Sequence, residues 1–484
     1  MENNISRKNR LIIPKWRGFS ITKKLGELES TGNREIHSFE NDLKLKKDEW
    51  NKKHDFVSAM ELLIYKGVED ISVKEAEDYI INSNYNSMLI NNPNEKIEDI
   101  LENKEIYIKI SKIRKYLVKY PRDAIMWVDL SLYYTVINQK NKAIKAMKIA
   151  LQIDCYNRFI IRSAVRLFLH YNEFDYAYYI LKNNKLVLYD PWVNATYIAV
   201  SQMMNKNIKN IKNSKYLIES NNFSTYSLTE LTCSLGNLEL INGKEKNAKK
   251  LFKRAIISPN DNVAAQLQWI SKNLTYIQGI EKIKNKNIKC NFEFSTIERC
   301  YNEDFEGAIN EVEKWQSDDL ISTNPNMVAA TLYSSVFGNF EKSEEKIQAG
   351  IRKENDNIKL KIQSAYNNIN MENFDKAEQI LNMIEKEDSK TEDKIFLLAD
   401  RGMLMYRKGD NKNGEKYYRE AIKLAGKEQM MSLMASAVFH LAKEKYRAKD
   451  DDVNAAVKEA KELYKYIKDP VILYNVKKFQ KEIE

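Results

Sequence analysis

Apolar residues after residue 120 recur at the three- and four-residue spacing that predicts amphipathic helices. The clearest stretch begins at Ala124 and reads AIMWVDLSLYYTVINQKNKAIKAMKIALQID. Its apolar positions fall into two blocks, and the polar link NQKN between them predicts a turn. A single helix pair of this length cannot bury its apolar face alone, so it must stack on further pairs. The stretch therefore predicts one unit of a helical array.

Similar pairs follow along the chain, with clear copies beginning at Thr229 and Ile395. A small residue recurs where the second helix of each pair would cross the first, because only a small side chain lets the two backbones approach closely. The steps between these residues are 34 (143 to 177), 35 (308 to 343) and 37 (377 to 414). A longer step leaves room for a degenerate pair at about 192–228, and another irregular pair is expected near 262–279. The small residues are Ala143, Ala177, Ala248, Ala308, Ser343, Ala377 and Gly414.

The pattern resembles the tetratricopeptide repeat (TPR) family. In the first unit the large and small slots of that repeat are taken by Trp127, Leu130, Tyr134, Ala143 and Ala150, with departures at Ser131, Met147 and Cys155. The resemblance implies an all-α protein, a right-handed α-solenoid of helix-turn-helix repeats. We expect three regions: a basic, partly extended segment at 1–45, a helical region at 46–119 that packs on the array, and the solenoid at 120–484. The last stretch, PVILYNVKKFQKEIE, is expected to be a capping helix.

Composition agrees with a long helical array. At 484 residues the chain is too long for one compact core, and Gly (14) and Pro (7) are scarce. No apolar run reaches the roughly 18 residues needed to cross a bilayer, and the first residues lack the pattern of a signal peptide. The four cysteines are scattered, as expected of free thiols in a reducing compartment. We therefore expect a cytoplasmic protein without a membrane partner.

Motifs for chemistry are missing from the sequence. The four histidines (His37, His54, His170 and His440) show no metal-ligand spacing, and no nucleotide-binding or nucleophile motif occurs. We predict that the protein is not an enzyme and has no catalytic residues, no cofactor and no metal site.

The TPR resemblance implies a concave groove lined by the first helix of each pair. The positions that point into such a groove are occupied here by Asp129, Arg162, Arg166, Tyr197 and Asn237. Arg162 and Arg166 share a helix face with His170, since the three are spaced at i, i+4 and i+8. Two arginines so placed could grip a carboxylate or phosphate of a partner. The alternative is that both lie on a solvated face.

The basic segment at 1–45 carries a second candidate for binding. Its sequence PKWRGF places an aromatic residue between two cations, so Trp16 and Arg17 are a possible docking anchor. Trp16 would either insert into a pocket of a partner or fold back onto this protein's own helices.

Charge suggests a further alternative. The formal net charge is +10; residues 1–24 carry seven Lys or Arg against one acidic residue, and residues 206–289 carry fifteen against six. A basic middle could attract nucleic acid, or it could be a solvated lysine-rich face.

These observations favour a non-catalytic scaffold or adaptor that binds a protein or peptide partner through the groove, within a multi-protein complex. That complex could include a separate enzyme subunit. One alternative is a peptide-responsive bacterial TPR regulator, and another is a helical-repeat protein that binds nucleic acid through the basic middle.

Overall fold

The protein is described here by a computed structural model that covers residues 11–19, 36–54, 58–59, 62, 70–82, 105–208, 211–220, 222–273, 288, 291–387 and 389–483. Every regular element within these ranges is a helix, which confirms the all-α prediction. Among the described residues, no helix is long and apolar enough to cross a membrane. The chain divides into two compact units: unit 1 is formed by residues 1–294 and 317–321, and unit 2 by residues 295–316 and 322–484.

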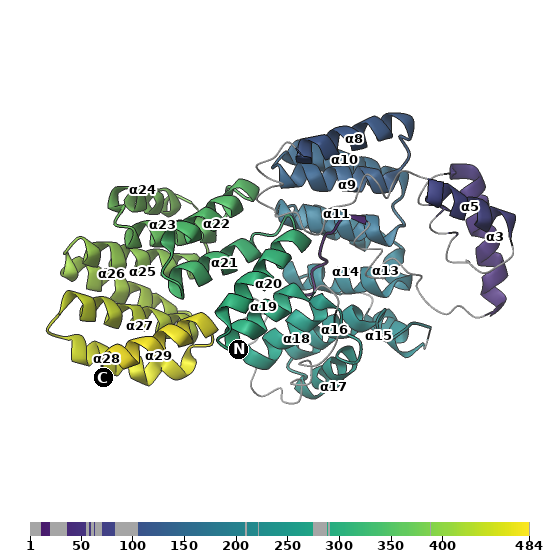
Figure 1. Ribbon diagram of the computed structural model, residues 1–484. Coiled ribbons are helices and arrows are strands. Elements are labelled where there is room, and N and C mark those ends of the chain that lie inside the picture. The colour runs from purple at the N-terminus through teal and green to yellow at the C-terminus, as the bar shows by residue number, and fades with distance from the viewer. Residues whose placement is uncertain are drawn as a thin grey trace. The chain divides into compact units, whose positions relative to one another are not determined.

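Unit 1 is a stack of helix pairs, which lie side by side in chain order in Figure 1. The first helices of the pairs are α9 (Ala124–Val136), α11 (Arg158–His170), α14 (Pro191–Met203), α16 (Thr229–Ile241) and α18 (Asp261–Asn273). The helices that follow them are α10 (Lys140–Ile153), α12 (Phe174–Lys182), α13 (Leu186–Tyr189) with α15 (Ile211–Glu219), and α17 (Glu245–Ala255). The degenerate pair expected at 192–228 is confirmed as α14 and α15. The second helix of the pair expected near 262–279 lies outside the described residues.

Local sequence signals set where these helices begin. The Asn157 side chain accepts hydrogen bonds from the amides of Phe159 and Ile160 at the start of α11. At the start of α14 the Asp190 side chain accepts from two amides, and Pro191 occupies the first turn, where its missing N–H costs nothing. These caps satisfy donors that have no partner within the helix.

Small residues lie where the helices of a pair cross, as predicted. Ala143, Ala177 and Ala248 are fully buried in α10, α12 and α17. A Cβ atom built on Gly236 of α16 would lie 2.5 Å from the Phe252 ring of α17. The backbone of α16 therefore lies closer to α17 than it could if residue 236 carried a side chain.

Unit 2 repeats the same arrangement. Its helices are α19 (Phe292–Tyr301), α20 (Phe305–Asp318), α21 (Asn324–Ser335), α22 (Phe340–Lys353), α23 (Ile358–Asn370), α24 (Phe374–Glu385), α25 (Thr391–Arg407), α26 (Asn411–Lys427), α27 (Met431–Ala448), α28 (Val453–Leu463) and α29 (Pro470–Ile483), with a 3-10 turn at Tyr464–Tyr466. The crossing of α25 and α26 uses Gly402 and Gly414, because a Cβ on either would lie within 2.6 Å of a tyrosine ring.

The C-terminal helix α29 packs against two parts of unit 2. On one side the Phe479 ring lies 5.8 Å from the Phe439 ring of α27. On the other side the Tyr474 ring lies 4.9 Å from the Phe305 ring of α20. The helix expected to cap the array thus also contacts the helices at the beginning of unit 2.

The region before the repeats contains α3 (Ile36–Lys53), α5 (Ile71–Asn82) and α8 (Glu105–Lys119). α3 begins ten residues before the helical region predicted from residue 46. The prediction placed this start too late because polar residues mask the weak apolar spacing of α3. Residues 55–57, 60–61, 63–69 and 83–104 of the helical region predicted at 46–119 lie outside the described residues. The boundary at residue 120 between this region and the solenoid stays a prediction.

Candidate protein-binding surface

Nine residues of the N-terminus, 11–19, are enclosed by the helices of unit 1. Residues 11–18 form no helix, and Figure 1 shows the segment in purple beside α11 and α14. Ile12, Trp16, Arg17 and Phe19 expose 4% or less of their surface. We call residues 11–19 the N-terminal segment, and the side chains that contact it the segment-binding surface.

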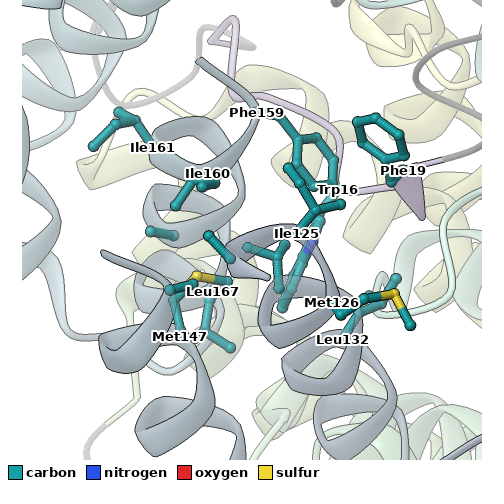
Figure 2. Close-up of a cluster of buried hydrophobic side chains, with 14 of the residues drawn as sticks. Trp16, Phe19, Ile125, Met126, Leu132, Met147, Phe159, Ile160, Ile161 and Leu167 are labelled. Atoms are coloured by element: carbon teal, nitrogen blue, oxygen red, sulfur yellow. The ribbon is translucent and has the colours of Figure 1, made fainter. Parts of the chain in front are cut away.

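Apolar side chains hold both ends and the middle of the N-terminal segment. Figure 2 shows Trp16 pointing between Ile125, Met126 and Phe159, which belong to the same buried cluster. The Phe19 ring meets the Phe159 ring edge-on, with centroids 5.5 Å apart. Ile12 lies in a second cluster built from α16, α17 and α18. The segment therefore spans the unit from α18 to α9.

The two cations of the segment meet three carboxylates of unit 1. Arg17 donates through Nε and Nη2 to the two oxygens of Asp318, at 2.7 Å each, and Nη2 also lies 2.5 Å from Oδ2 of Asp261. Lys15 Nζ lies 2.9 Å from Oδ2 of Asp261 and 3.5 Å from Oε2 of Glu293. These side chains are nearly all inaccessible to water, so the pairs are only weakly screened.

Burial and charge oppose each other in this cluster. Burial alone would raise the pKa of Asp261, but the positive charges of Arg17 and Lys15 outweigh it and hold that pKa well below its usual value. Burial alone would lower the pKa of Lys15, but Asp261 and Glu293 raise it above its usual value. Asp261 and Lys15 are therefore both charged at neutral pH.

Main-chain groups of the segment are also recognised. The Asn262 side-chain amide donates to the carbonyl oxygen of Ile13 at 2.9 Å. The amide of Phe19 donates to Oδ1 of Asp129 at 3.3 Å, whereas Oδ2 of Asp129 has no hydrogen-bond partner among the described residues. Burial raises the pKa of Asp129 to about 8, against the opposing effect of the Phe19 hydrogen bond. Contacts of this kind read the backbone of a peptide and not its sequence.

A buried polar network supports the surface from behind. Glu230 of α16 accepts from Arg162 of α11 at 2.8 Å and from Asn260 and Asn262 at 2.9 and 3.2 Å. Because Asn262 also contacts the Ile13 carbonyl, the network connects the segment to three first helices. Asn262 is thereby held in the orientation that meets the peptide backbone.

The structure brings together some of the residues predicted from the TPR resemblance. Asp129, Trp16 and Arg17 meet at the segment-binding surface, and Trp16 takes the second of its two predicted arrangements, folded onto the chain's own helices. Arg162 is buried, paired with Glu230, and 5.0 Å from the ring centre of Trp192. Arg162 therefore does not lie on a solvated face, which was the alternative predicted for it.

The other predicted residues lie elsewhere. Arg166 is half-buried and makes no hydrogen bond or ion pair with the described residues. Tyr197 stacks on Tyr178 of α12, with ring centroids 6.0 Å apart, and so faces a neighbouring second helix. Asn237 is fully buried and accepts from Gln266 at 2.9 Å.

Five members of this site were not predicted from the sequence: Lys15, Asp261, Asn262, Glu293 and Asp318. Acidic residues occur on most helices of the chain, so no local signal distinguishes these carboxylates. The spacing of Lys15 and Arg17 was a weak signal for a carboxylate site. Two cations beside a buried aromatic residue need acidic partners if their side chains are buried with it.

Unit 2 has a polar cluster of its own on α25 and α27, each of which is the first helix of a pair. Arg407 of α25 makes a forked pair with Glu444 of α27, at 2.7 and 3.0 Å. Burial raises the pKa of Asp400 well above its usual value, and burial lowers the pKa of His440 to about 4. The Arg407–Glu444 pair joins two neighbouring helices of the unit. Within the described ranges, no group of three or more His, Cys, Asp or Glu side chains is placed to hold a metal ion.

Comparison with known proteins finds no matching family and only distantly similar solved structures. No family model matches the sequence, and no curated protein matches it. Similar solved structures include the APC/C hetero-tetramer Cut9-Hcn1 (13% identity over 87% of this chain and 83% of that chain, TM-score 0.46). They also include yeast Tom70 (14% identity over 80% of this chain and 95% of that chain, TM-score 0.33). A third is YrrB, a TPR protein with an unusual peptide-binding site (13% identity over 51% of this chain and 95% of that chain, TM-score 0.17).

The chain is an all-α helical-repeat protein. This conclusion rests on the stacked helix pairs and their small crossing residues, since the likenesses above have low identity and TM-scores below 0.5.

Proposed function

We propose that this protein is a non-catalytic scaffold that binds a non-helical segment of a protein partner on the segment-binding surface of unit 1, within a multi-protein complex. One observation carries the proposal: this surface already encloses nine residues of polypeptide through apolar, ionic and main-chain contacts. A surface that recognises both the backbone and alternate side chains of a peptide has the properties of a peptide-binding site.

Affinity capture from the native cells tests this function. The tagged full-length protein is isolated with and without nuclease, and bound proteins are identified by mass spectrometry. We expect a stoichiometric protein that survives nuclease treatment, and an enzyme subunit would be recognised in the same sample. Loss of all partners on nuclease treatment would contradict the proposal and favour binding of nucleic acid.

A charge-reversal variant separates these outcomes further. Lys246, Lys250 and Lys253 are exposed on α17. Replacing them with Glu leaves a protein partner bound to unit 1 but abolishes binding of nucleic acid to the basic middle. The matched control replaces the same residues with Gln, which removes charge without introducing repulsion.

A further inference from the structure

We propose that the N-terminal segment is a tethered ligand of unit 1, and that a partner displaces it with a peptide of similar chemistry: an aromatic residue between two cations, Lys-aromatic-Arg. The inference rests on the proposed function and specifies both the partner's binding sequence and the control of access to it.

The carboxylates of the surface require a cationic occupant. Asp261 and Asp318 each expose 4% of their side chains while paired with Arg17. If the segment left and an apolar peptide took its place, both carboxylates would be buried without a counter-charge, which is strongly unfavourable. A peptide that binds here must therefore supply positive charge at the positions of Lys15 and Arg17.

The aromatic residue between the cations fits the opposite side of the segment. Lys15 and Arg17 meet the carboxylates, whereas Trp16 enters the apolar cluster with Ile125 and Met126. Successive side chains of a non-helical peptide can point to opposite sides, so one cation, one aromatic residue and a second cation match this surface in order. Arg is favoured over Lys at the second position because its planar fork matches both oxygens of Asp318.

Residues 11–18 of the segment belong to no helix, so their release breaks no helical hydrogen bond within these residues. Two of its main-chain contacts to the surface, at Ile13 and Phe19, are made to side chains. The ion pairs join residues 244 and 301 positions apart in the sequence, so they do not contribute to any local element. Sixteen residues of chain join Phe19 to α3, so the segment stays covalently attached to unit 1. A separate peptide must therefore compete with an intramolecular ligand.

Hydrogen exchange of the native full-length protein tests the displacement. The probe is a synthetic peptide of residues 11–19, LIIPKWRGF, added in excess. We expect deuterium uptake within residues 11–19 of the protein to rise with peptide concentration. The control peptide LIIPEWEGF carries Glu at both cationic positions and should leave uptake unchanged. Unchanged uptake with the cationic peptide at saturating concentration would overturn the inference, because the segment would then be a permanent structural part.

Direct binding provides the second test. The fluorescently labelled peptide LIIPKWRGF is titrated into the wild-type protein and into the double variant Trp16→Ala with Arg17→Ala. We expect the double variant to bind at least about tenfold more tightly, since its own segment no longer competes. Adding Asp261→Asn and Asp318→Asn should remove that binding. Equal affinity of the wild-type protein and the double variant would contradict the tethered-ligand role, and the exchange experiment decides the question if the double variant does not fold.

The outcomes distinguish this inference from the proposed function. Partner proteins that are captured although the peptide never displaces the segment would leave the scaffold role intact and place the binding site elsewhere. Exchange of the peptide without any captured protein would support the ligand chemistry of the surface and contradict the scaffold role.

Discussion

The Arg17 guanidinium makes a forked ion pair with the Asp318 carboxylate, with Nε and Nη2 each 2.7 Å from one oxygen. The two residues are 301 positions apart in the sequence. The pair connects the N-terminal segment to residues 317–321, which belong to unit 1 although they begin at the end of α20. The Arg17 guanidinium thus joins the N-terminal segment to residues 317–321 within unit 1.

Replacing Arg17 with Met should weaken seating of the segment by about 3–5 kcal/mol, because Asp261 and Asp318 would lose their buried counter-charge. The measurement is hydrogen exchange of the Phe19 amide, which is protected by Asp129 only while the segment is seated. Adding Asp318→Asn to Arg17→Met should restore part of the loss. The exposed Arg122 offers a control, since Arg122→Met should leave the exchange unchanged. Equal exchange in all variants would show that the ion pair does not hold the segment.

Arg162 and Arg166 should respond differently to replacement by alanine. Arg162→Ala removes the partner of Glu230, whose side chain is only 2% exposed, and should destabilise the protein by about 3–5 kcal/mol. Arg166→Ala removes a half-buried side chain without an ion pair to the described residues and should cost less than about 1 kcal/mol. Urea unfolding followed by circular dichroism measures both. Similar midpoints for the two variants would contradict the buried Arg162–Glu230 pair.

Replacing Gly236 with alanine should destabilise the α16–α17 pair by about 1–3 kcal/mol. The added Cβ would lie 2.5 Å from the Phe252 ring, so the ring or the backbone must move. Gly426 is the matched control, because a Cβ there would lie 3.4 Å from the sulfur of Met434, an ordinary contact. Gly426→Ala should therefore leave the urea midpoint unchanged or slightly higher. A Gly236→Ala variant as stable as the wild type would show that the assigned crossing point is wrong.

Asp129 should make stability depend on pH. Burial raises its pKa from 3.8 to about 8, so the folded protein holds this proton more tightly than the unfolded chain does. Its contribution is complete below about pH 4 and is lost as the pH rises toward about 8. The variant Asp129→Asn cannot ionise and should gain stability over the wild type by at most about 1.4 kcal/mol per pH unit between these limits. Unfolding free energies of both proteins from pH 5 to pH 9 measure this, and a difference that does not change with pH would refute it.

The helix pairs of the fold could be predicted from the sequence because their signals are local. The three- and four-residue apolar spacing, the caps at Asn157 and Asp190, and the small residues at the crossings act within about 34 residues. Large partners such as Phe252 opposite Gly236 follow from the same repeat. The all-α fold, the degenerate pair α14–α15 and the C-terminal helix α29 are therefore determined by patterns within the sequence itself.

Only the tertiary structure decided what the polar and N-terminal residues contact. The sequence by itself identified Trp16 as an anchor but left a partner's pocket and the chain's own helices as alternatives. It left Arg162 either in the groove or on a solvated face, whereas in the structure Arg162 is buried against Glu230, 68 residues away. A helix period shows which residues share a face, but the stacking of distant pairs decides which face is covered and which carboxylate meets which cation. Asp261 and Asp318 became a cation site because folding brought them to one place and removed water from both.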